Sequence, residues 1–89
     1  MISFETMLVN KALIQQAAQV FGEKIRSLNP KESSIEQYNE NVGDTISDLE
    51  LSASDAEIVQ AFFDTYIGVL QTDRAAATEF VQTFMRPTI

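Results

Sequence analysis

The chain has 89 residues, a length typical of one domain with a single core. Hydrophobic residues make up 45% and charged residues 21% of the sequence, as in ordinary globular proteins, so extended disorder is not expected. The net charge is −7, and a chain without a basic surface to neutralise phosphates is not expected to bind nucleic acid or an anionic membrane directly.

The first residues carry no sign of a signal peptide, because they lack a basic segment and the apolar run at residues 7–9 is followed by Asn10 and Lys11. No stretch approaches the roughly 18 apolar residues that a membrane-spanning helix needs. The absence of cysteine excludes disulfides and thiolate sites. We therefore expect a soluble, cytoplasmic protein that does not bind membranes.

The first predicted element is a long helix over residues 3–28. Ser3 is a suitable N-cap, and Glu5 lies in the first turn, where the helix dipole favours an acid. One apolar side, interrupted only by Lys11, is formed at three- and four-residue steps by Phe4, Met7, Ile14, Ala18, Phe21, Ile25 and Leu28. Asn29 precedes Pro30, which pushes it out of the helical region and ends the helix.

A second helix is predicted over residues 34–50. Ser33 and Glu36 form a capping box at its start. Its apolar side consists of Ile35, Tyr38, Val42, Ile46 and Leu49. Gly43 is its weak point, since one helix could end there and a second could begin with Asp44 as its cap.

Two further helices are predicted over residues 55–71 and 74–86, although they could also form one continuous helix. Ser54 and Glu57 make a capping box for the first, which is apolar nearly all round and is therefore expected at the centre of the core or at an oligomer contact. No strand pattern persists anywhere. The prediction is an all-α fold, a three- or four-helix bundle forming one domain over residues 1–89.

The aromatic content of the predicted core is high for so short a chain. Its members are Phe4, Phe21, Phe62, Phe63, Phe80 and Phe84. Surplus apolar area on a small domain often marks an interface, so a homodimer is one expected assembly.

Most catalytic and cofactor chemistries are excluded by residue type. Without histidine or cysteine there is no Ser-His or Cys-His pair and no zinc site. The three glycines are about twenty residues apart and open no phosphate-binding loop. A calcium loop around Gly43 fails, because its first and last ligand positions would be Tyr38 and Leu49. We expect no enzyme activity, no metal and no cofactor.

The charge is concentrated in one segment, since residues 32–57 contain eight acids and no base. Acids recur every fourth residue at Glu32, Glu36, Glu40, Asp44 and Asp48, on the side of the helix opposite its apolar residues. Two ordinary explanations are a solvated outer face and pairing, within the fold or in a dimer, with the bases Lys11, Lys24, Arg26 and Lys31.

The functional hypothesis is a protein-binding module that docks this acidic face on a basic surface of a partner protein. Its predicted binding residues are Glu36, Glu40, Asp44, Asp48 and Glu50. Carboxylates spaced about 6 Å along a helix can stand in for nucleic-acid phosphates, so the partner could be a DNA- or RNA-handling protein that this chain inhibits or modulates. Small acidic helical proteins of phages and mobile elements often act in this way, but no motif ties this chain to such a family. The alternative is a structural, adaptor or oligomerisation module that acts through apolar helix faces.

Overall fold

A computed structural model describes residues 2–27 and 35–86 of the chain. These residues form five helices and no strand. The helices are α1 (Phe4–Val9), α2 (Lys11–Arg26), α3 (Ile35–Asp48), α4 (Ala53–Leu70) and α5 (Arg74–Met85). The all-α prediction is confirmed, whereas the predicted count of three or four helices is too low.

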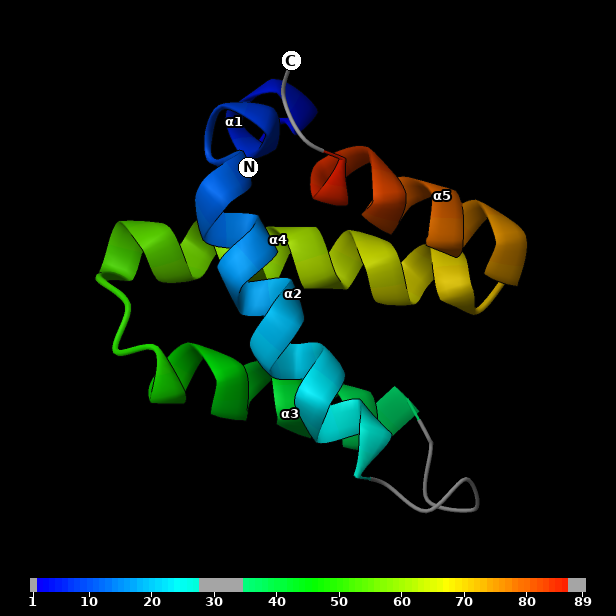
Figure 1. The fold of residues 1–89 in the computed structure, drawn as a ribbon, viewed down its shortest axis with the longest axis horizontal. Helices are drawn as coiled ribbons and strands as arrows, with labels where there is room; N and C mark the ends of the chain where they lie inside the picture. The colour runs from blue at the N-terminus through cyan, green and yellow to red at the C-terminus, as the bar shows by residue number, and fades with distance from the viewer. Residues whose placement is uncertain (1, 28–34, 87–89) are drawn as a thin grey trace.

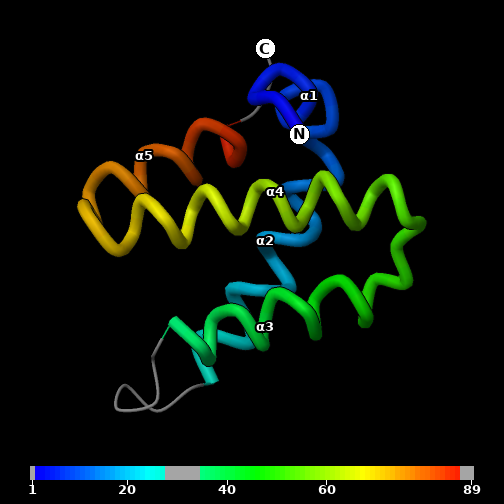
Figure 2. The backbone as a smooth tube through the Cα atoms, turned by 180° about the vertical axis from the view of Figure 1, so that it is seen from behind, coloured from blue at the N-terminus to red at the C-terminus, as the bar shows by residue number. Residues whose placement is uncertain are grey.

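The helix α4 occupies the centre of the fold and packs against the other four helices. Figures 1 and 2 show α3 and α5 on opposite sides of α4, and α2 crossing α4 steeply. The short helix α1 lies beside the C-terminal end of α5. The architecture is a small helical bundle in which one helix crosses the others instead of running alongside them.

The prediction of one continuous helix over residues 3–28 is wrong, because the chain breaks at Asn10. This residue has φ −103° and ψ 32°, outside the helical range. Its side-chain Nδ2 donates to the carbonyl oxygen of Thr6 at 2.8 Å, and its backbone N–H donates to the carbonyl of Met7 at 3.1 Å. A side chain that competes in this way for backbone partners favours a cap over a helix interior. The chain therefore turns between α1 and α2, next to Lys11, which interrupts the apolar pattern.

The other helices differ from prediction mainly at their ends. The helix α3 runs through Gly43 without a break. The cap of α4 is Ser52, whose Oγ accepts from the N–H of Asp55 at 3.3 Å, so the predicted cap at Ser54 is wrong. Separate helices α4 and α5 are confirmed, because Asp73 caps α5. The predicted cap Ser33, the acid Glu32 and the predicted stop at Asn29-Pro30 lie outside the described residues.

The buried core is largely aromatic and centres on α4. Phe62 and Phe63 are fully buried and meet edge to face, with ring centroids 5.1 Å apart. Phe62 also contacts Phe84 of α5, and Phe63 contacts Phe21 of α2. Phe4 was expected in the core, but it is 49% exposed and covers the rings of α5 from outside.

The buried side of α3 does not coincide with its predicted apolar side, because the helix is rotated about its own axis. Its buried residues are Asn41, Val42 and Thr45, whereas Ile35 is 36% exposed. The hydroxyl of Thr45 donates to the carbonyl of Asn41 at 2.7 Å. The side-chain Nδ2 of Asn41 is buried and has no hydrogen-bond partner among the described residues. An unpaired buried donor of this kind costs about 1–3 kcal/mol of stability.

Replacing Asn41 by leucine is therefore expected to stabilise the fold. Asn41→Leu removes the unpaired amide and keeps a side chain of similar length, so the free energy of unfolding should rise by about 1–2 kcal/mol. Urea denaturation followed by circular dichroism measures this change. The matched control is Asn39→Leu at an exposed position of the same helix, which should stay within about 0.5 kcal/mol of wild type. A loss of stability in Asn41→Leu would contradict the prediction.

Candidate functional site

All five acids of the predicted binding face lie on the surface. Glu36, Glu40, Asp44 and Asp48 are exposed on α3, and Glu50 is exposed just after its end. No basic residue occurs in the sequence between Lys31 and Arg74, so neither α3 nor α4 contributes a positive charge. The side of the molecule formed by α3 therefore has a negative potential that its own residues do not offset.

The acids do not form a straight row. Each step of four residues turns by about 40° around the helix, so the line winds around α3 from one end to the other. Glu36 and Glu40 lie opposite the buried residues Asn41 and Thr45, whereas the line reaches the side of α2 at Asp48. The first half of the stripe thus faces outward, and its last member faces a neighbouring helix.

Asp48 forms an ion pair with Lys24 of α2. The Lys24 Nζ lies 2.6 Å from Asp48 Oδ2, and the two side chains are 27% and 58% exposed. The hydrogen bond to Asp48 raises the pKa of Lys24, and the charges of Asp48, Asp44 and Glu23 raise it further, while desolvation opposes them. The expected pairing with a base of the first helix therefore holds for Asp48, which has a role within the fold.

The other acids of the face lack such a partner. Lys24–Asp48 is the one ion pair found in residues 2–27 and 35–86. Lys31, which was also considered as a partner, lies outside these ranges. Glu36 stands in the first turn of α3, where the helix dipole favours its charge. Glu36, Glu40, Asp44 and Glu50 are thus the members of the predicted face that are exposed and form no ion pair in the described chain.

Glu50 has an unusual backbone. Its φ of 50° is the one positive φ of a non-glycine residue in the described chain. This left-handed conformation follows the last turn of α3, where glycine or asparagine is the usual residue. It costs an ordinary side chain roughly 1–2 kcal/mol, and such strain is often found at functional positions. In the sequence, the sign of this conformation is a predicted helix end at Glu50 that no glycine follows.

Other kinds of site find no support in residues 2–27 and 35–86. No group of three acids in these ranges is arranged to hold a metal ion. No helix in them is both long and apolar enough to cross a membrane. No protein-family model, curated protein or solved structure matches the chain.

The strain at Glu50 predicts a stabilising substitution. Glu50→Gly should raise the free energy of unfolding by about 1 kcal/mol, because glycine adopts a positive φ without a steric cost. Urea denaturation measures the difference. Glu50→Ala is the control, since it removes the same charge and keeps the strain. An equal gain in both variants would show that charge, and not the backbone, is the cause.

The contact between Lys24 and Asp48 predicts a pH-dependent contribution to stability. Because folding raises the pKa of Lys24 above its ordinary value of 10.5, its contribution is fully present below that pH and is lost as pH rises through the folded-state pKa. Lys24→Met should thus be less stable than wild type near about pH 8, and the difference should vanish near about pH 12. Urea midpoints at the two pH values test this. Lys11→Met on the same helix serves as control, and an equal loss there would refute the role of the pair.

Proposed function

We propose that the protein is a binding module whose acidic face on α3 docks on a basic surface of a partner protein. The binding residues are Glu36, Glu40 and Asp44, extended by Glu50. Asp48 belongs to the same face, but its charge is paired with Lys24. It therefore contributes less to partner binding than the sequence pattern suggests.

The observation that carries the proposal is the unpaired state of this charge. Three consecutive acids of the stripe are exposed and form no ion pair in the described chain, although the charge of Asp44 reaches Lys24 and raises its pKa. Complementary charge on a partner would accelerate encounter and fix orientation, which is the main contribution of electrostatics at interfaces. A strained backbone at Glu50 keeps a further acid at the end of the same helix.

A finer form of the proposal concerns the class of partner. Glu36, Glu40 and Asp44 rise by about 6 Å per step along α3, so they present a line of negative charge. Such a line can occupy a groove that otherwise holds nucleic-acid phosphates. We infer that a DNA- or RNA-handling protein, inhibited or modulated by this chain, fits the face best.

A second candidate function rests on exposed apolar residues. Val9 is 85% exposed, and Phe4, Leu8 and Met85 are also exposed where α1 meets the end of α5. Exposed apolar groups of this kind occur at protein contacts. They support the alternative of an oligomerisation or adaptor module, including a homodimer.

Charge reversal separates the two proposals. The test variant carries Glu36→Lys, Glu40→Lys and Asp44→Lys, and leaves the Lys24–Asp48 pair intact. Wild type and variant are used as affinity baits in a lysate of the source organism, captured proteins are identified by mass spectrometry, and the purified partner is titrated. The variant should bind at least tenfold more weakly, and wild-type affinity should fall steeply with salt.

The matched control carries three reversals elsewhere, Glu57→Lys, Asp64→Lys and Glu79→Lys, which change the net charge equally at exposed positions of α4 and α5. Its affinity should stay within about threefold of wild type. Displacement of the chain by duplex DNA or RNA would support the finer proposal. Binding that survives charge reversal and about 0.5 M salt, but is lost in Leu8→Ser with Val9→Ser, would instead establish the apolar alternative.

A further inference from the structure

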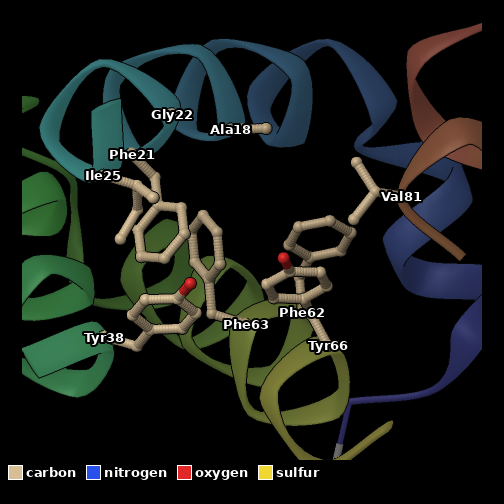
Figure 3. A pocket seen from close by; sticks show the side chains of 9 residues that line it. All are labelled: Ala18, Phe21, Gly22, Ile25, Tyr38, Phe62, Phe63, Tyr66 and Val81. Carbon is tan, nitrogen blue, oxygen red and sulfur yellow. The ribbon is translucent and has the colours of Figure 1, made fainter. Parts of the chain in front are cut away.

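A pocket of about 200 Å³ lies where α2, α3, α4 and α5 meet. Figure 3 shows aromatic side chains from three of these helices around it. They are Phe21 of α2, Tyr38 of α3, and Phe62, Phe63 and Tyr66 of α4. Val81 adds an aliphatic wall from α5. None of the residues of the acidic face lines this pocket.

The aromatic rings hold one another in place. The ring of Phe21 lies 4.6 Å from that of Phe63, and it meets Tyr38 at 6.0 Å and Tyr66 at 6.4 Å in edge-to-face arrangements. Ring separations of this size are favourable for aromatic pairs. Because both Phe21 and Phe63 are buried, the wall is formed before any ligand arrives.

Two small residues of α2 leave the space open. Ala18 and Gly22, four residues apart and hence on one side of the helix, both line the pocket. A Cβ atom added at Gly22 would meet no described atom within 4 Å, apart from its chain neighbours and its own helix backbone. A larger side chain at this position would enter the pocket.

The polar groups of the pocket are two tyrosine hydroxyls. Figure 3 shows the hydroxyl oxygens of Tyr38 and Tyr66 on the α2 side of their rings. Neither hydroxyl has a hydrogen-bond partner among the described residues, and both side chains are half-buried. Burial raises the pKa of Tyr66 above its ordinary value of 10.0, nearby Tyr38 raises it further, and Arg74 opposes the rise. The Tyr66 hydroxyl therefore stays neutral at physiological pH, and both tyrosine hydroxyls can donate or accept a hydrogen bond.

We propose that this pocket binds a small neutral aromatic molecule with one ring or two fused rings and one hydrogen-bonding group. Indole is an example of such a molecule. Ring edges and faces in the wall match an aromatic ligand, and the two hydroxyls match its polar group. A carboxylate or phosphate ligand is disfavoured, since no charged residue is among the lining residues described and the chain has a net charge of −7.

The volume sets the size of the ligand. A dry apolar cavity of about 150 Å³ in another protein accepts benzene. Pockets for drug-sized molecules have volumes of about 300–1,000 Å³. The present pocket lies between these cases, which corresponds to a bicyclic molecule of the size of indole.

Titration of the isotope-labelled full chain with indole, followed by amide chemical shifts, tests the proposal. Wild type should show saturable shift changes centred on residues 18–25 and 62–66. Gly22→Leu, which fills the space, should weaken binding at least tenfold while the helical circular dichroism spectrum is kept. The matched control is Gly43→Leu, the same change at an exposed glycine of α3 that does not line the pocket.

Two results would overturn the proposal. One is the absence of saturable binding to wild type up to about 5 mM indole, a concentration that detects dissociation constants in the millimolar range. The other is unchanged binding in Gly22→Leu. If that variant fails to fold, Ala18→Leu takes its place, because it enlarges the neighbouring small residue on the same wall.

A second comparison tests the role of the hydroxyls. Indene has the shape of indole without its N–H donor, so the ratio of the two affinities isolates the hydrogen bond. Replacing Tyr38 and Tyr66 together by phenylalanine should reduce the preference for indole over indene by about three- to tenfold. An unchanged preference would refute the assignment of the hydroxyls. This test is independent of the proposed function of the acidic face, since neither the substitutions nor the ligands change a charge.

Discussion

Phe62 and Phe63 are adjacent on α4, so their side chains leave the helix about 100° apart and meet different neighbours. The ring of Phe62 packs on Phe80 and Phe84, which fixes α5 against α4. The ring of Phe63 packs on Phe21, which fixes α2 where it crosses α4 (Figure 1). A short chain buries only a small core, so large buried aromatic rings dominate its packing energy. Through these contacts α4 connects α5 with α2 at the centre of the fold.

The contact of α3 with the core is more polar than that of the other helices. It packs on α2 and α4, but two of its three buried residues, Asn41 and Thr45, are polar. A buried amide without a partner offsets part of what the apolar contacts contribute. The ion pair between Lys24 and Asp48 lies on the side of α3 that faces α2, and the buried side of the helix is rotated in the same direction from its apolar stripe. This rotation leaves Glu36 and Glu40 opposite the core and gives the acidic face its outward direction.

The sequence predicts the helices well because each has a periodic apolar side, but it does not predict effects that depend on a single distant or local contact. Asn10 is compatible with a helix by pattern, and the break comes from its side-chain bond to Thr6. The exposure of the acids follows from their position opposite the apolar stripe, whereas the choice of Asp48 as the partner of Lys24 depends on how two helices cross. The pocket is invisible in the sequence for the same reason, because its lining comes from four helices and its space comes from small residues on one of them.

The two proposed sites share one helix. Tyr38 lines the pocket, and in the sequence of α3 it stands between Glu36 and Glu40 of the acidic face. A ligand that contacts Tyr38 from inside adds apolar packing to the helix whose contact with the core is the most polar. Any difference in how α3 is placed with and without that ligand changes the spacing of the carboxylates relative to a partner. By linkage, a partner that binds one placement of α3 better must change the affinity of the pocket by the same factor. The placement of α3, which carries residues of both sites, is therefore the property that would couple a small aromatic ligand to the binding of a basic protein.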